Sequence, residues 1–125
     1  MGWSDLLPYF RAISKDMLHP MIVDNKISMY SDMFPFFLQG VPSGYFNVLQ
    51  QQPLTRGWGH TIADTLDKVS LRGLQGDAVQ LARVLLRMAA KPGPIAAHKT
   101  ADQVKALLAA EGLDEVLKLE KRYPF

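Results

Sequence analysis

The clearest pattern of apolar and polar residues along the chain lies between residues 70 and 90. Leu74, Ala78 and Leu81 belong to a series of apolar residues that are spaced three or four positions apart. This spacing places their side chains on one face of a helix, with arginines and glutamines largely on the other. We therefore predict a helix over residues 70–90 that ends at the Pro-Gly-Pro sequence of residues 92–94.

Shorter helical patterns occur toward both ends of the chain. Residues 4–17 and 34–39 each place a proline early in the segment, where its missing N–H costs little. Thr100 and Gln103 form a capping-box pattern at the start of another helix. Residues 114–121 are predicted to form a last helical segment.

Three short runs favour β-strands instead, at residues 21–23, 27–30 and 41–48. Strands that alternate with helices predict an α/β fold with a layered sheet. Two or three strands make a poor sheet, because each edge exposes unpaired backbone groups. We therefore expect further strands from outside this chain, either from an N-terminal half or from a second copy.

Composition narrows the classes of function. The chain has 125 residues, 48% of them hydrophobic and 21% charged, which is typical of one soluble globular domain. The net charge is only +2 and the basic residues are scattered, so we expect no binding to nucleic acid. Cysteine is absent, which excludes disulfides and thiolate zinc sites.

No apolar run is long enough for a membrane span. We find no signal peptide, and the compartment stays open: cytoplasmic, or secreted if a signal precedes this sequence.

One histidine stands at the end of a glycine-containing loop, in the sequence Gly57-Trp58-Gly59-His60. Asp64 and Asp67 follow it before the long helix. An imidazole is a good zinc ligand, and its second nitrogen needs an oriented acceptor, for which Asp64 and Asp67 are the candidates and Asp64 is preferred. The alternative is that both aspartates cap the turn and the helix that follow.

An upstream segment strengthens the metal-ligand hypothesis. It reads Ser31-Asp32-Met33-Phe34-Pro35-Phe36 and is followed by Gly40-Val41-Pro42. In order and spacing, the two segments resemble the C-terminal half of the zinc-dependent aminopeptidase-like exopeptidases, which carry two metal ions. Glutamate carboxypeptidase and the transferrin receptor share their fold. Residues 1–125 would then form one partial domain, with a peptidase-like core portion at 1–90 and a C-terminal helical extension at 91–125.

The resemblance implies a fold and a partial active site. The fold would be part of a three-layer αβα sandwich, with a few strands of a mixed sheet and four or five helices. His60 would be the last zinc ligand, while the earlier ligands and the general base have no match, because the sequence contains no Glu-Glu. Ser31 and Asp32 would lie beside the cleft, unless they simply cap the next helix.

Two more residues are candidates for the substrate pocket, and two others depart from the family pattern. Tyr45 and Trp58 could line the pocket, although packing is the alternative role for both. Met33 replaces a histidine that could share a proton, and Gly59 stands where many relatives have a tyrosine. The three histidines of the chain lie on separate segments, so we do not expect them to form a site of their own.

The resulting expectation is a C-terminal fragment of a zinc metallopeptidase that is inactive alone. The parent protein would bind zinc and hydrolyse the N-terminal bond of a peptide substrate. This chain would need the missing N-terminal half, or a second copy, as a partner. Two alternatives remain open: a non-catalytic interaction module with a degenerate peptidase fold, and a small α/β domain that associates with itself.

Overall fold

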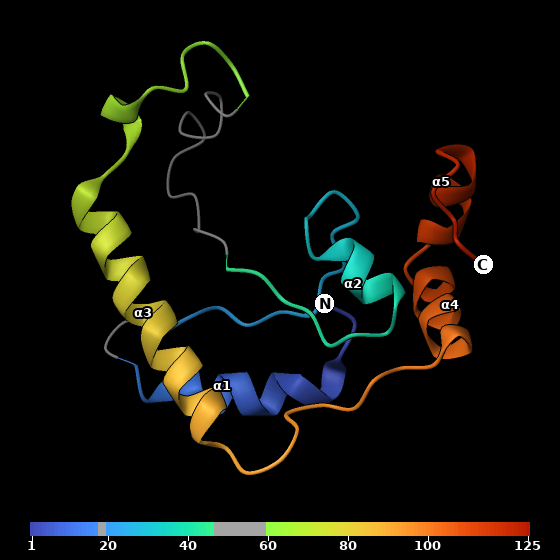
Figure 1. Cartoon of the computed structure of the whole chain (residues 1–125), viewed down its shortest axis with the longest axis horizontal. Coiled ribbons are helices and arrows are strands. Elements are labelled where there is room, and N and C mark those ends of the chain that lie inside the picture. Colours follow the sequence, from blue (N-terminus) through green and yellow to red (C-terminus); the bar gives the residue numbers. More distant parts are fainter. Residues whose placement is uncertain (18–19, 47–59) are drawn as a thin grey trace. The chain divides into compact units, whose positions relative to one another are not determined.

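A computed structural model describes residues 1–17, 20–46 and 60–125 of the chain (Figure 1). Its contacts divide into two units, Met1–Tyr45 with Lys91–Phe125 and Phe46–Ala90, and each unit is described by itself. The elements, in chain order, are the 3-10 helix η1 (Ser4–Leu6), the helices α1 (Leu7–Lys15) and α2 (Phe34–Leu38), the 3-10 helix η3 (Leu66–Lys68), and the helices α3 (Leu71–Ala90), α4 (Ala101–Ala110) and α5 (Leu113–Leu119).

The described ranges contain no β-strand, so the predicted α/β sandwich with a mixed sheet is wrong. Residues 21–23 and 27–30 still alternate in exposure: Ile27 and Met29 are buried, whereas Tyr30 is exposed. An alternating pattern selects a buried face, but a strand also needs a neighbouring backbone to pair with. The run at 41–48 has no regular structure over 41–46, and its last two residues lie outside the described ranges.

Side chains, and not a neighbouring strand, form hydrogen bonds with the backbone of Met21 and Met29. The Ser14 hydroxyl donates to the carbonyl of Met21 at 2.9 Å, and the N–H of Met21 donates back to the same oxygen at 2.7 Å. The Arg122 guanidinium donates to the carbonyl of Met29 at 2.8 Å. Backbone polar groups that lie near a core need such partners.

The helical predictions are confirmed, with small shifts at the ends. The capping box of α4 is present, since the Gln103 N–H donates to Thr100 Oγ1 at 3.3 Å and the Thr100 N–H donates to Gln103 Oε1 at 2.8 Å. The predicted side-chain cap of α2 is wrong. Met33 occupies that position and makes no capping hydrogen bond.

The unit formed by the two chain ends has an aromatic core. Trp3 and Phe37 meet edge to face with ring centroids 5.7 Å apart, and Phe34 lies nearly parallel to Phe37 at 5.8 Å. Leu108 of α4 and Leu117 of α5 belong to the same buried cluster. Figure 1 shows α4 and α5 as neighbours at the C-terminal end of the chain. The beginning and the end of the sequence therefore build one core together.

The backbone of Gly40, in the N-terminal part of this unit, lies in close contact with the backbone of Lys99, in the C-terminal part. It follows α2 with a φ of 73°, and its N–H donates to the carbonyl of Phe37 at 2.9 Å, as in a Schellman C-cap. Its own carbonyl accepts the N–H of Lys99 at 3.0 Å. A Cβ added to Gly40 would lie 2.0 Å from the carbonyl oxygen of Lys99, so only glycine fits at this position.

Contacts of Arg122 and Glu120 with Tyr30 and Phe34 hold the end of α5. Arg122 lies over the rings of Tyr30 and Phe34, at 5.6 and 5.8 Å from their centroids, and pairs with Glu120 at 3.0 Å. The Tyr30 hydroxyl donates to Glu120 at 2.8 Å. This hydrogen bond, and then the guanidinium of Arg122, lower the pKa of Glu120, while the carboxylate raises the pKa of Tyr30.

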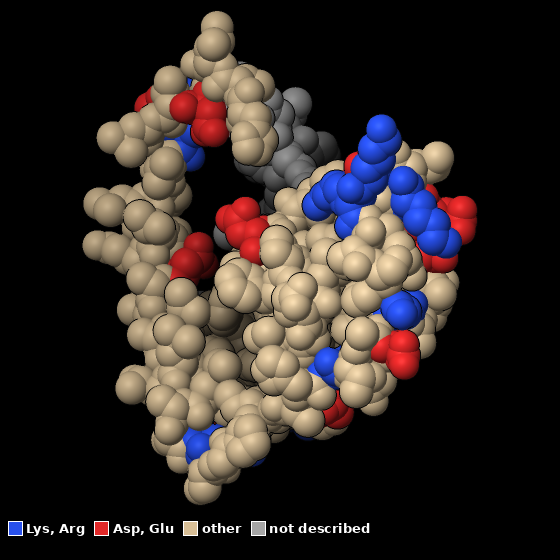
Figure 2. Space-filling view, turned by 45° about the vertical axis from the view of Figure 1, so that its right-hand side comes forward, with Lys and Arg blue, Asp and Glu red and all other residues tan. Residues whose placement is uncertain are grey.

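Charges on this unit are mixed in sign. Lys118 of α5 pairs with Glu115 at 2.9 Å and with Asp114 at 3.4 Å, and these contacts raise its pKa. Figure 2 shows basic and acidic side chains adjoining one another on this face. Lys118 and Arg122 near the C-terminal end of the chain are thus both paired with carboxylates.

The first unit buries a cluster of large apolar side chains, whereas large apolar side chains are exposed in the unit of residues 46–90. Val84 is its only buried hydrophobic residue within the described part, whereas Leu71, Leu74, Leu85 and others on α3 are exposed. A 20-residue helix with few buried side chains draws little stability from packing. None of the helices in the described ranges has the length and apolar content required to cross a membrane.

Candidate functional site

His60 is exposed and stands at the start of a tight turn. Its φ is 64°, in the left-handed region, where asparagine, aspartate and histidine are the most frequent residues after glycine. Only one other non-glycine residue in the described ranges has a positive φ, Lys121 at the end of α5. The turn at position 60 therefore accommodates a histidine as well as an asparagine or aspartate.

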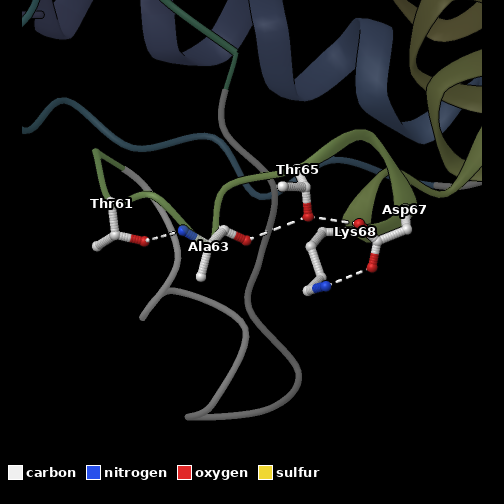
Figure 3. Close-up of polar contacts among 5 residues, drawn as sticks. All are labelled: Thr61, Ala63, Thr65, Asp67 and Lys68. Carbon is white, nitrogen blue, oxygen red and sulfur yellow. Dashed lines mark hydrogen bonds and ion pairs between the residues drawn. The ribbon is translucent and has the colours of Figure 1, made fainter.

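Local hydrogen bonds hold the residues that follow (Figure 3). The Ala63 N–H donates to Thr61 Oγ1 at 3.2 Å, and the Asp64 N–H donates to the Thr61 carbonyl at 3.1 Å. The Thr65 N–H then donates to the carbonyl of Ala63 at 3.0 Å. Each of these contacts joins residues two or three positions apart, so together they form a local turn within residues 61–65.

Asp67 is the most constrained carboxylate of this segment (Figure 3). It accepts hydrogen bonds from the Lys68 ammonium and from the Thr65 hydroxyl, one on each oxygen. The contact with Lys68, and then that with Thr65, lower the pKa of Asp67. The Thr65 hydroxyl also lies 3.4 Å from the Ala63 carbonyl, and its single proton can serve only one of the two acceptors at a time.

Of the two candidate partners of His60, the structure places Asp67, and not the preferred Asp64, in a network of side-chain hydrogen bonds. Asp64 is exposed and contributes its backbone N–H, whereas Asp67 contributes its carboxylate. Lys68 was not singled out from the sequence. Its signal there was a basic residue directly after an aspartate, just before the helix predicted over residues 70–90.

The other candidates lie in the unit of the two chain ends. The Ser31 hydroxyl donates to the Ser28 carbonyl at 2.9 Å, and the Ser31 carbonyl accepts the N–H of Phe34 at 3.0 Å. Asp32 is exposed, and Tyr45 is 45% exposed. Trp58 and Gly59 lie outside the described residues. Ser31, Asp32 and Tyr45 are therefore surface positions around α2, described apart from His60 and Asp64.

The described residues do not fit a zinc ion by themselves. Within residues 1–17, 20–46 and 60–125, no three histidine or carboxylate side chains are grouped as a metal ion needs. Catalytic zinc takes at least three protein ligands. His60 could supply one imidazole, but the carboxylate of Asp67 is already engaged by Lys68. Comparisons with protein-family models, curated proteins and solved structures find no match for this chain.

Proposed function

We propose that this chain supplies one part of the active site of a zinc-dependent exopeptidase of aminopeptidase type. Its contribution is the imidazole of His60 together with cleft-lining residues near Ser31 and Asp32. The other zinc ligands and the general base come from another polypeptide segment, since the sequence holds no Glu-Glu pair. The reaction class is hydrolysis of the N-terminal bond of a peptide.

The observation that carries this proposal is the order and spacing of two sequence segments. Ser31-Asp32 precedes Gly40-Val41-Pro42, and Gly57-Trp58-Gly59-His60 is followed by four acidic or hydroxyl-bearing residues before the long helix predicted over residues 70–90.

Zinc binding should then depend on the partner segment. One imidazole does not hold zinc with useful affinity, so the isolated chain is expected to bind no stoichiometric zinc. Elemental analysis of the purified chain tests this directly. His60→Ala is the variant of interest, and His98→Ala is its matched control, because His98 is also an exposed histidine. Stoichiometric zinc that is lost only in His60→Ala would show that the chain builds its own site, and a shared site would be ruled out.

The activity itself is tested on the protein as it occurs in its own cells. Antibodies against the α4–α5 segment would isolate it with whatever segment accompanies it. We expect the isolate to hydrolyse aminoacyl p-nitroanilides, to lose this activity with phenanthroline and to lose it in a His60→Ala strain. The His98→Ala strain should retain it. Equal activity in both strains, or none in the unaltered protein, would contradict the proposal.

A second candidate is a non-catalytic interaction module. The observation in its favour is the set of large apolar side chains exposed on residues 60–90, among them Ile62, Leu66 and Leu86. Apolar surface of this extent is typical of interaction sites. A stable complex that contains neither zinc nor peptidase activity would favour the module over the enzyme.

A further inference from the structure

Six of the apolar residues of α3 form a continuous row along the helix. They are separated by three, four, three, four and three positions, which is the a and d spacing of a heptad repeat. We call this row the seam of α3: Leu71, Leu74, Ala78, Leu81, Leu85 and Met88. A seam of this kind fits another helix with the same spacing.

The seam is exposed over most of its length. Leu71 is 68% exposed, Leu74 57% and Leu85 52%. A contiguous exposed apolar row of this kind is typical of a site that another apolar surface covers. The seam therefore lacks a cover within the described part of its own unit.

The charges of α3 leave the seam free for a like copy. In the heptad, Arg72, Arg83 and Arg87 fall at positions b, f and c, which all point away from the seam. The flanking e positions are uncharged, and Asp77 is the one charged residue at a g position. Two copies can therefore approach seam to seam without placing arginines opposite one another.

The order of large and small residues selects the direction of pairing. In an antiparallel pair centred between Val79 and Gln80, Leu71 of one copy faces Met88 of the other and Leu74 faces Leu85. Ala78 then faces Leu81, so each small residue meets a large one. In a parallel pair Ala78 would face Ala78 and leave a gap, which costs stability.

We propose that α3 forms an antiparallel pair with α3 of a second copy of this chain through the seam. The pair has two-fold symmetry, so each copy presents the same surface to the other. A 20-residue helix is about 30 Å long, and one helix pair of that length buries less than a standard interface. We therefore expect a reversible, concentration-dependent dimer. This proposal does not depend on the exopeptidase function.

Crosslinking tests the direction, because the chain has no cysteine of its own. Leu71→Cys and Met88→Cys would be prepared as two separate proteins and treated with a short bismaleimide. The antiparallel pair predicts crosslinked dimer mainly in the mixture of the two proteins. Efficient crosslinking of either protein alone would indicate a parallel pair, and no crosslinking in any sample would indicate no seam contact. Both results would overturn the proposal.

Sedimentation equilibrium tests the surface. Leu74→Gln combined with Leu85→Gln changes the contact between Leu74 of one copy and Leu85 of the other, which occurs twice in the dimer. It should weaken dimerisation at least about 100-fold, since each buried leucine contributes roughly a factor of ten. The matched control combines Val79→Gln with Leu86→Gln, two residues that are 60% and 70% exposed but lie outside the seam. The control should dimerise as the unaltered chain does, with circular dichroism confirming that both variants fold. A monomeric unaltered chain, or equal weakening in both variants, would refute the proposal.

Discussion

The backbone contact at Gly40 leads to the sharpest stability prediction. Gly40 and Gly93 both have a φ of 73°, but their surroundings differ. A Cβ at Gly40 would lie 2.0 Å from the carbonyl oxygen of Lys99, whereas a Cβ at Gly93 would meet no atom within 4 Å. Gly93→Ala therefore measures the cost of the backbone conformation alone, and Gly40→Ala measures that cost together with the clash.

The two costs can be estimated separately. An alanine in the left-handed region costs about 1–2 kcal/mol, offset by roughly 0.4–1 kcal/mol from the stiffer unfolded chain. Gly93→Ala should therefore lower the free energy of unfolding by about 1 kcal/mol. At Gly40 the Lys99 carbonyl must also move by roughly 1 Å or more, which breaks the hydrogen bond between the Lys99 N–H and the Gly40 carbonyl at an added cost of about 1–3 kcal/mol.

Urea and thermal unfolding would measure both variants. For a unit of this size, about 1 kcal/mol corresponds to roughly 4–8 °C in Tm. Gly93→Ala should lose about that much, and Gly40→Ala at least about twice as much. Fluorescence of Trp3, in a Trp58→Phe background, would report the same core. If Gly40→Ala were no less stable than Gly93→Ala, the close approach of Lys99 to Gly40 would be wrong.

Three further substitutions test the ends of the helices. Lys121→Gly should raise the free energy of unfolding in urea by about 1 kcal/mol, because Lys121 adopts a φ of 56° directly after Glu120, the C-cap of α5; a loss of stability would contradict this helix end. Thr100→Ala should lower it by about 1 kcal/mol, since it removes the acceptor for the Gln103 N–H, and an unchanged urea midpoint would argue against the capping box. Tyr30→Phe should lower the urea midpoint at pH 7 and lose its effect in acid. The pKa of Glu120 is lowered in the folded chain, so its contacts stabilise the fold above the ordinary value of 4.5 and are lost as the pH falls through the lower, folded value. A difference between Tyr30→Phe and the unaltered chain that persisted in strong acid would rule out this contact.

The helices could be predicted from the sequence because their causes are local. The spacing of apolar residues in α3 and the Thr100-x-x-Gln103 pattern of α4 each act within one or two turns. Prediction failed for α2, where two good capping residues, Ser31 and Asp32, stand one or two positions too early. The Ser31 hydroxyl bonds to Ser28 instead, so the local turn before the helix competed with the cap.

The absence of strands from the described ranges could not be predicted from the sequence. A run of residues forms a strand only where a neighbouring backbone pairs with it, and the sequence does not show whether such a neighbour exists. Residues 27–30 have the alternation of a strand, and the structure follows that alternation in burying Ile27 and Met29. Their backbone has no neighbouring strand in the described ranges, and an arginine from the far end of the chain serves Met29 instead. The candidate site shows the same limit. Position 60 could be singled out, but the pairing of Asp67 with Lys68 rests on geometry that spacing does not fix.

The shared core of the two chain ends has a consequence for synthesis on the ribosome. Trp3 donates its indole N–H to the carbonyl of Ala97, 94 residues further along the chain. At about 5–20 residues per second, the ribosome needs roughly 5–20 s to add that stretch. During this interval Phe34 and Phe37 have no α4 or α5 to cover them. The nascent chain therefore carries uncovered aromatic residues until its last helices emerge, which makes it a natural client for chaperones that bind exposed apolar segments.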